Sequence, residues 1–198
     1  MRKALTVVLL LTISIAGYSQ MGIGVRLGDP SGITFKKYNG DNALELSIGR
    51  FSQRNSGFFN SRFDIWFDDQ QFGYTDVNFQ SFKSSAPIGL QVHYLMHKDW
   101  FASEFDGLQW YYGFGGQLRA QTFTFAYRYK IDGNSNWINA PNEKVTDLDI
   151  GADGVLGAEY EFEDVPIRIF TDVTLFMEVV DNPFLFWFQY GIGGRYMF

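Results

Sequence analysis

Apolar and polar residues alternate along most of the chain after Met21, and the pattern is clearest in residues 108–124. In the first part of this segment the even positions carry mainly Leu, Trp, Tyr and Phe, whereas the odd positions carry mainly Gly, Gln and Arg. Successive side chains of a β-strand point to opposite faces, so a period of two predicts a strand with one apolar and one polar face.

Seven further segments show the same alternation, and strong turn formers separate several of them, such as Asp-Pro-Ser-Gly at 29–32 and Asn-Gly-Asp-Asn at 39–42. The predicted strands are 22–28, 33–38, 43–51, 86–97, 108–124, 148–162, 167–179 and 186–198. An even number of strands returns both ends of the chain to the same side of the sheet.

The connections between these strands differ in length on the two sides. Short turns are expected beside the termini, at 39–42, 98–107 and 163–166, and loops on the other side, at 29–32, 52–84, 128–146 and 180–184. Both long loops fall on the second side, as in transmembrane barrels. The sequence predicts an all-β fold: a closed antiparallel up-and-down transmembrane β-barrel of about eight strands, or ten if 52–84 adds a hairpin, with both termini periplasmic.

The size of such a barrel indicates which face points outward. The interior of an eight-stranded barrel is barely wide enough for side chains, so small residues are expected inside. Glycines lie mainly on the polar face, at 49, 89, 113, 115, 151, 157, 191 and 193, and the apolar face is bulky. The apolar face is therefore expected to point outward into lipid, because a continuous apolar belt exceeds what soluble monomers expose. A soluble barrel of the lipocalin type, with its apolar face inside, is the alternative.

The polar face would then line the lumen, where charges of both signs must pair because an unpaired buried charge costs several kcal/mol. Arg168 is expected to contact Glu161 or Glu159 across the turn at 163–166. We predict a lumen plugged by paired side chains, with a narrow solute channel as the alternative. The predicted lumen network comprises Arg26, Lys36, Glu45, His93, Arg119, Asp149, Asp153, Glu159, Glu161, Arg168, Asp172, Glu178 and Arg195.

Aromatic residues gather near the strand ends, which favours two girdles at the membrane interfaces. One girdle would contain Trp110, Tyr112, Tyr160, Phe162, Tyr196 and Phe198, and the other Phe184, Phe186 and Phe188.

The first residues place Arg2 and Lys3 before a short apolar run, Ala4 to Ala16, followed by small residues. This pattern predicts a cleaved secretory signal peptide over 1–19 and one barrel domain over 20–198, with a retained signal anchor as the alternative. Without the two basic residues the net charge changes from −6 to −8, so nucleic acid is not an expected partner. The chain has no Cys, which excludes disulfides and a cysteine-linked lipid anchor.

Residues 22–48, 107–119 and 151–166, which contain RLGDPSGITFKKY, GLQWYYGFGG and GADGVLGAEYEFEDVP, resemble small outer-membrane β-barrel proteins of Gram-negative bacteria. In size these are of the OmpA/OmpX type, and the nearest resemblance is to an uncharacterised family among them. The resemblance implies location in the outer membrane and assembly by the outer-membrane insertion machinery. We expect a monomer whose partners are the lipid bilayer and lipopolysaccharide. The last segment resembles the sorting signal of such proteins, with Tyr190, Ile192, Tyr196 and Phe198 at alternating positions, although Gly194 interrupts the pattern.

No reaction is indicated by the residues. The chain has two histidines: His93 is expected in the lumen and His97 at the periplasmic end, so an enzyme acting on lipid A is only an alternative. Neither a cofactor nor a metal is expected. Residues Asp132, Asn134, Asn136 and Glu143 match positions 1, 3, 5 and 12 of a calcium loop, but Trp137 stands where that loop requires Gly, so a plain polar loop is favoured.

The long loop 52–84 is acidic and rich in aromatic residues. Long loops in compact domains are usually functional or disordered, and the aromatic content argues against disorder. The loop is expected to extend neighbouring strands, to add a hairpin or to fold over the barrel mouth. Our hypothesis is that loops 52–84 and 128–146 give the protein a structural or surface-interaction role.

Overall fold

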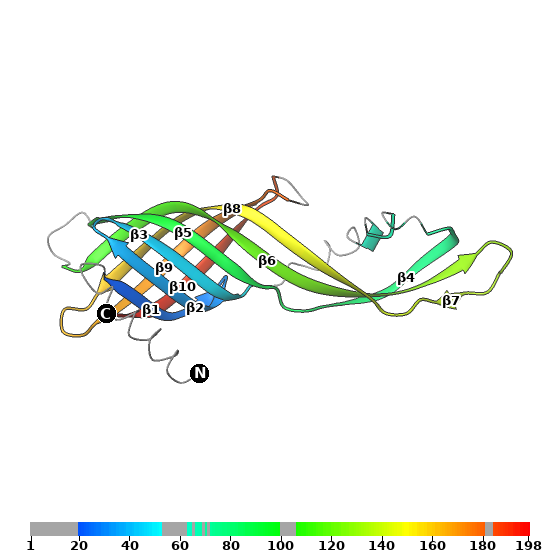
Figure 1. The fold of residues 1–198 in the computed structure, drawn as a ribbon, viewed down its shortest axis with the longest axis horizontal. Helices are drawn as coiled ribbons and strands as arrows, with labels where there is room; N and C mark the ends of the chain where they lie inside the picture. The colour runs from blue at the N-terminus through cyan, green and yellow to red at the C-terminus, as the bar shows by residue number, and fades with distance from the viewer. Residues whose placement is uncertain are drawn as a thin grey trace, which may run out of the picture. The chain divides into compact units, whose positions relative to one another are not determined.

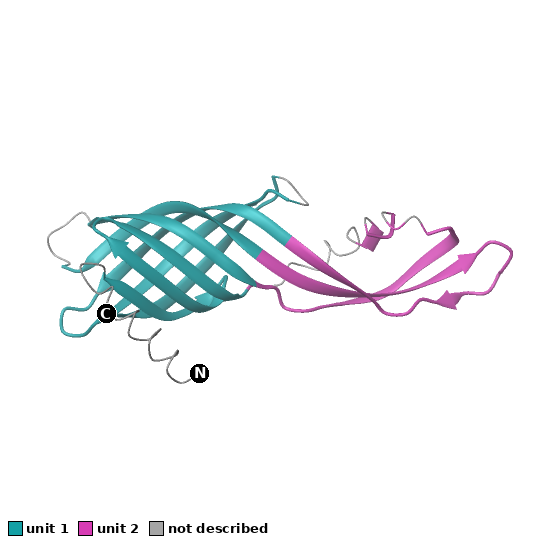
Figure 2. Cartoon of the chain, in the orientation of Figure 1, with its two compact units in different colours: residues 1–50, 89–118, 149–198 teal, residues 51–88, 119–148 magenta. Residues whose placement is uncertain are grey.

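A computed structural model describes residues 20–52, 63–64, 66–68, 70, 72–99, 106–180 and 184–198. The predicted signal peptide lies outside the described residues. Within these ranges, no helix has the length and apolar character needed to cross a membrane. The chain divides into two compact units (Figure 2): unit 1 comprises residues 1–50, 89–118 and 149–198, and unit 2 comprises residues 51–88 and 119–148.

In the described part of the chain, eight antiparallel strands form a closed barrel (Figure 1), which confirms the predicted fold class. The strands are β1 (Met21–Gly28), β2 (Ser31–Asn39), β3 (Asn42–Arg50), β5 (Ile88–Asp99), β6 (Leu108–Ile131), β8 (Glu143–Glu161), β9 (Ile167–Glu178) and β10 (Phe186–Met197). Around the ring they follow the order β6, β5, β3, β2, β1, β10, β9, β8, and pairing of β8 with β6 closes it.

Short turns and paired chain ends lie at one end of the barrel, which we call the terminus end. The turn between β2 and β3 is closed by the pair Asn39 and Asn42, and it places Gly40 at a positive φ of 60°, where glycine is favoured. Strand β1 pairs with β10 from Gly22 opposite Met197 to Gly28 opposite Gly191. The first and last strands of the barrel therefore hold each other in register.

The apolar face of the barrel points outward. On β9, residues at odd positions such as Ile169 and Val173 are exposed, and the alternate residues are buried. Phe188 is 74% exposed and Ile150 is 40% exposed, and Trp110 is half-buried on the same outer surface. This arrangement excludes the lipocalin-type alternative, which needs these side chains inside.

The barrel interior also contains large apolar side chains. From the sequence, only small and charged residues were expected there. Phe170, Phe176, Tyr111 and Leu95 are all buried there. Glycines supply the space for several of these rings. A Cβ atom on Gly157 would lie 2.5 Å from Tyr111 Cζ, one on Gly193 would lie 2.6 Å from Phe170 Cζ, and one on Gly151 would lie 2.3 Å from Phe176 Cζ. The glycines of the inner face therefore make room for specific rings.

Unit 2 contains two further strands, so the described residues form ten strands in all. Strand β4 (Tyr74–Ser84) pairs with residues 123–131 of β6, and β7 (Ile138–Asn139) pairs with Arg128 and Tyr129. Of the possibilities left open for loop 52–84, its second half thus extends the sheet by pairing with a neighbouring strand. The expected loop 128–146 is shorter than predicted, because β6 continues to Ile131 and β8 begins at Glu143.

An aromatic cluster fills one face of the unit 2 sheet. Phe123, Phe125 and Tyr127 occupy alternate positions of β6 and are buried together with Phe63. Phe125 lies edge-on to Phe63, with ring centroids 5.4 Å apart, and Trp66 stacks on Phe125 at the same distance. Aromatic pairs of this kind stabilise a fold beyond the area that they bury.

Candidate functional site: the polar interior of the barrel

The interior of the barrel holds most of the charged residues that the alternation assigned to it. Twelve of the thirteen predicted lumen residues are buried, and the exception is Glu161, whose side chain is 43% exposed. They come from all eight barrel strands. Their burial follows from the closed barrel, since each strand turns every second side chain inward.

One group of contacts joins β1 to β9. Arg26 donates two hydrogen bonds to the carboxylate of Asp172, with Nη1–Oδ2 and Nη2–Oδ1 distances of 2.5 and 2.6 Å. The hydroxyl of Tyr111 donates to the same carboxylate at 3.3 Å. Paired hydrogen bonds between guanidinium and carboxylate fix orientation as well as charge.

A second group crosses the full width of the barrel. Lys36 on β2 lies 2.6 Å from Glu159 on β8, and these strands are four apart in the ring of eight, so they face each other across the bore. Tyr38 donates to the same carboxylate at 3.1 Å. Arg168 contacts Glu159 at 3.0 Å and also contacts Glu161, so the predicted contact across the turn at 163–166 is present.

Glu45 on β3 connects this group to Arg195 on β10. Arg195 on β10 lies 2.7 Å from Glu45 on β3, and the guanidinium of Arg195 stands 3.7 Å from Glu159. The Arg195 guanidinium also lies over the ring of Phe170, 3.6 Å from its centroid, which adds a cation–π contact. Four strands are thereby joined through one buried arginine.

Above these ion pairs, away from the terminus end, glutamine side chains share the interior with buried charged residues such as Asp153. His93 lies 3.1 Å from Asp153, and Gln91 donates to the same carboxylate at 3.4 Å. Gln189 on β10 lies within 3.5 Å of Gln91 and donates to Gln117 on β6 at 3.4 Å. The two histidines thus lie in the interior: His93 as described, and His97 3.4 Å from Glu159, near the terminus end.

Several interior residues were missing from the predicted network. Gln91, Gln117, Gln189, Tyr38 and Tyr111 are buried and take part in its hydrogen bonds. The signal for finding them was present, because each lies at an inward position of its strand. Considering charged residues alone missed these neutral partners.

The weak calcium candidate lies in unit 2, outside the barrel interior. Asp132, Asn134 and Asn136 are exposed at the tip between β6 and β7, and Glu143 is half-buried on β8. The Asn134 side chain accepts a hydrogen bond from the Asn136 amide at 3.0 Å, as in an ordinary Asx turn. Among the residues that the structure describes, no group of three or more His, Cys, Asp and Glu side chains is arranged to hold a metal ion.

Unit 2 also presents a polar surface, on the side of its sheet opposite the aromatic cluster. Arg128 and Lys130 lie over the ring of Trp137, 4.8 and 4.5 Å from its centroid. Lys130 forms an ion pair of 3.1 Å with Asp76. On the cluster side, burial and the neighbouring Tyr129 raise the pKa of Tyr74, which keeps this phenol neutral.

The positions of the proposed sorting signal lie on the outer face of β10. Tyr190, Ile192 and Tyr196 are more than half exposed, and Phe198 follows the end of the strand. Tyr112, Phe162, Phe184 and Phe186, from the two predicted girdles, are likewise exposed. Trp110 and Tyr160 are half-buried.

Comparison with known proteins supports the architecture. The sequence matches no protein-family model and none of the curated proteins. Among solved structures, the chain is similar to the N-terminal β-barrel domain of Pseudomonas aeruginosa OprF, with a TM-score of 0.50 and 12% identity over 91% of this chain and 96% of that one.

Two other solved structures that it matches are Ail, the attachment invasion locus protein of Yersinia pestis, and Neisserial surface protein A. Ail gives a TM-score of 0.46 and 11% identity, over 91% of this chain and 97% of that one. Neisserial surface protein A gives 0.41 and 10%, over 91% and 96%. Together with the closed ring of strands, the likeness to the OprF domain shows that this chain has the fold of the small eight-stranded outer-membrane β-barrels.

Proposed function

We propose that the protein is an integral outer-membrane β-barrel with a plugged lumen and a structural or surface-interaction role. The observation that carries this proposal is the inversion of the barrel: its outer surface is apolar and its interior holds ion pairs. Exposed residues such as Leu27, Phe188 and Ile192 surround it. Such a belt favours lipid as the surrounding medium, since soluble monomers rarely expose continuous apolar patches larger than a few hundred Å².

The contacts across the bore support the plug. Lys36 and Glu159 meet from opposite walls at 2.6 Å, and Gln91 and Gln189, also four strands apart, meet at 3.5 Å. A solute would have to break charge pairs that are shielded from water, and breaking a buried pair costs about 3–5 kcal/mol. The role proposed here therefore needs no flow of solute through the barrel.

The orientation follows from the lengths of the connections. We place the terminus end in the periplasm, because outer-membrane barrels carry short turns there and longer loops outside. Unit 2, which contains loops 52–84 and 128–146, is then extracellular. Its aromatic cluster gives it an apolar core of its own, and Trp137, 40% exposed beside Arg128 and Lys130, offers a contact surface.

Two measurements on the full chain test this proposal. Refolded into lipid vesicles, the protein is expected to migrate differently on a gel before and after boiling, as a closed barrel does, and to give no large stable conductance in planar bilayers. Protease added to intact cells is expected to cut within unit 2 and to leave the barrel. Identical migration before and after boiling would contradict the barrel in lipid, and steady conductance would contradict the plug.

A further inference from the structure

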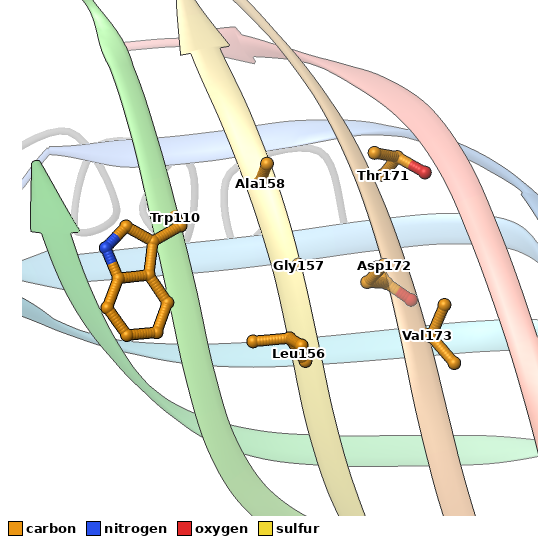
Figure 3. Close-up of a pocket in the computed structure, with 7 residues that line it drawn as sticks. All are labelled: Trp110, Leu156, Gly157, Ala158, Thr171, Asp172 and Val173. Atoms are coloured by element: carbon orange, nitrogen blue, oxygen red, sulfur yellow. The ribbon is translucent and has the colours of Figure 1, made fainter. Parts of the chain in front are cut away.

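A hollow on the outer surface of the barrel is lined by residues of β6, β8 and β9 (Figure 3). Its volume is about 480 Å³. Trp110 forms one wall, Leu156 and Val173 lie along its length, and Ala158 and Thr171 are the small residues that leave the space. The hollow lies entirely within unit 1.

The lining of the hollow is apolar although two polar residues contribute to it. The Asp172 carboxylate is paired with Arg26 inside the barrel, so this residue contributes mainly backbone. The Thr171 hydroxyl donates a hydrogen bond to the Gly191 carbonyl at 3.1 Å, which satisfies its polar group within the sheet. A ligand in the hollow would therefore meet hydrocarbon and an indole ring.

The hollow is continuous with the apolar belt of the barrel. Leu156 and Val173, which line it, are 58% and 48% exposed, and Ile169 beside it on β9 is exposed as well. Since the belt is the surface that we propose to face lipid, a flexible hydrocarbon chain from the bilayer can enter the hollow directly. Because the chain is already in hydrocarbon, van der Waals contacts with the walls of the hollow provide the attraction.

Acidic residues lie near the hollow, at the terminus end. The pair Ala158 and Thr171 is three residue pairs from the pair Glu161 and Arg168, which is about 10 Å along the strand. Glu163 and Asp164 follow in the exposed turn between β8 and β9. Asp106 is also exposed. The Gly107 carbonyl next to it accepts a hydrogen bond from the Glu161 amide at 2.9 Å, so Asp106 lies near the β8–β9 turn as well.

We infer that the hollow binds one acyl chain of a phospholipid whose headgroup carries an ammonium, such as phosphatidylethanolamine, with the headgroup beside Glu163 and Asp164. The hollow and the acidic turn are about 10 Å apart, which is roughly the distance between the acyl region and the headgroup of a phospholipid. An anionic headgroup such as that of phosphatidylglycerol is disfavoured by the acidic turn. The inference rests on the proposed function, because it requires the barrel to be in a bilayer.

The test uses the full chain refolded into vesicles of equimolar phosphatidylethanolamine and phosphatidylglycerol with matched acyl chains. After extraction in mild detergent, the lipids that remain bound are measured by mass spectrometry. The unaltered protein is expected to retain phosphatidylethanolamine over phosphatidylglycerol by about fivefold, the effect of one charge at a membrane surface.

Two sets of substitutions test the acyl-chain site and the headgroup site separately. Ala158→Leu fills the hollow and is expected to lower retention of both lipids about tenfold, the equivalent of losing roughly ten van der Waals contacts between the acyl chain and the walls. Val25→Leu, at an exposed apolar position of β1 outside the hollow, is the matched control and should retain lipid normally. The triple change Asp106→Asn, Glu163→Gln and Asp164→Asn should abolish the preference between headgroups.

Asp41→Asn is the control for charge, because Asp41 lies in the β2–β3 turn, at the terminus end but on the opposite side of the ring. It should leave the preference intact. Equal retention by the unaltered protein and Ala158→Leu would overturn the hollow as the binding site, and a preference for phosphatidylglycerol would overturn the headgroup assignment. Gel migration before and after boiling, run on every variant, distinguishes these results from failure of the barrel itself: a protein that does not enter the vesicles contradicts the proposed function and this inference together.

Discussion

Strand β6 runs through both units, and its inward positions change character along the way. In the barrel part these positions include Gln117, whereas in unit 2 the same alternation continues through Phe123, Phe125 and Tyr127. The barrel thus has a polar interior and an apolar surface, and unit 2 has an apolar core. One strand shows both arrangements, which is expected if its two parts lie in different media: lipid requires an apolar exterior, and water favours an apolar interior.

The largest expected effect comes from breaking the ion pairs of the barrel. Glu159→Ala leaves Lys36 and Arg168 without their main carboxylate and is expected to lower the free energy of unfolding by about 3–5 kcal/mol. Urea unfolding in lipid vesicles, followed by tryptophan fluorescence, measures this change. Glu161→Ala, at a partly exposed carboxylate of the same strand, should cost at most about 1 kcal/mol. Equal losses for the two variants would contradict the importance that we assign to the buried pair.

The second change acts on unit 2. Phe125→Ala removes a buried ring from the aromatic cluster and is expected to destabilise that unit by about 3 kcal/mol. Limited proteolysis of the protein in vesicles should then cut unit 2 faster, while the gel migration of the unboiled barrel stays the same. Thr124→Ala, at the neighbouring half-buried position, is the control. Loss of the barrel's migration by Phe125→Ala would show that the two units do not depend on separate cores.

A smaller effect is expected from the glycines that make room for interior rings. Gly157→Ala would place a Cβ atom 2.5 Å from Tyr111 Cζ, so the ring must move, and a loss of about 1–3 kcal/mol is expected. Gly154→Ala on the same strand meets no atom within 4 Å and should be close to neutral. The same urea titration measures both variants, and a neutral Gly157→Ala would show that the interior of the barrel adapts easily.

The smallest effect is expected on the polar surface of unit 2. Lys130→Ala removes a cation–π contact with Trp137 and a partly exposed ion pair with Asp76, which together contribute about 1 kcal/mol or less. The rate of proteolysis of unit 2 should change by less than about fivefold, which corresponds to about 1 kcal/mol. A loss as large as that of Phe125→Ala would mean that the two faces of this sheet are equally important.

The barrel could be predicted from the sequence because its two faces differ so strongly in polarity. Six of the eight barrel strands were expected to within two residues of their observed ends, whereas β6 and β8 continue beyond the predicted segments, to Ile131 and from Glu143. Strand β4 was not assigned, because irregularities between Tyr74 and Asp76 and between Phe79 and Ser81 shift its register and interrupt the period of two. The continuation of β6 beyond residue 124 was missed because Phe123, Phe125 and Tyr127 reverse the polarity of its inward face.

The interior site could be predicted only in part. Alternation identifies which residues point inward, and it placed Lys36 and Glu159 on the same face as each other. Whether these two residues contact each other depends on the number of strands in the ring, which decides which strands face each other across the bore. Such strands are far apart in sequence, so alternation alone does not pair them. Contacts between neighbouring strands, such as Arg168 with Glu161, could be predicted because a short turn fixes their register.

The pairing of β1 with β10 has a consequence for the order of events in assembly. Met21 and Phe198 exchange two backbone hydrogen bonds, of 3.1 and 2.8 Å, although almost the whole chain separates them. Hairpins such as β2–β3 can form locally, but the ring cannot close until its final strand has been synthesised and brought to the first. Contacts of such long sequence separation form slowly. Until the ring closes, the first and last strands therefore keep unpaired edges, and the polypeptide needs protection from aggregation before it is assembled.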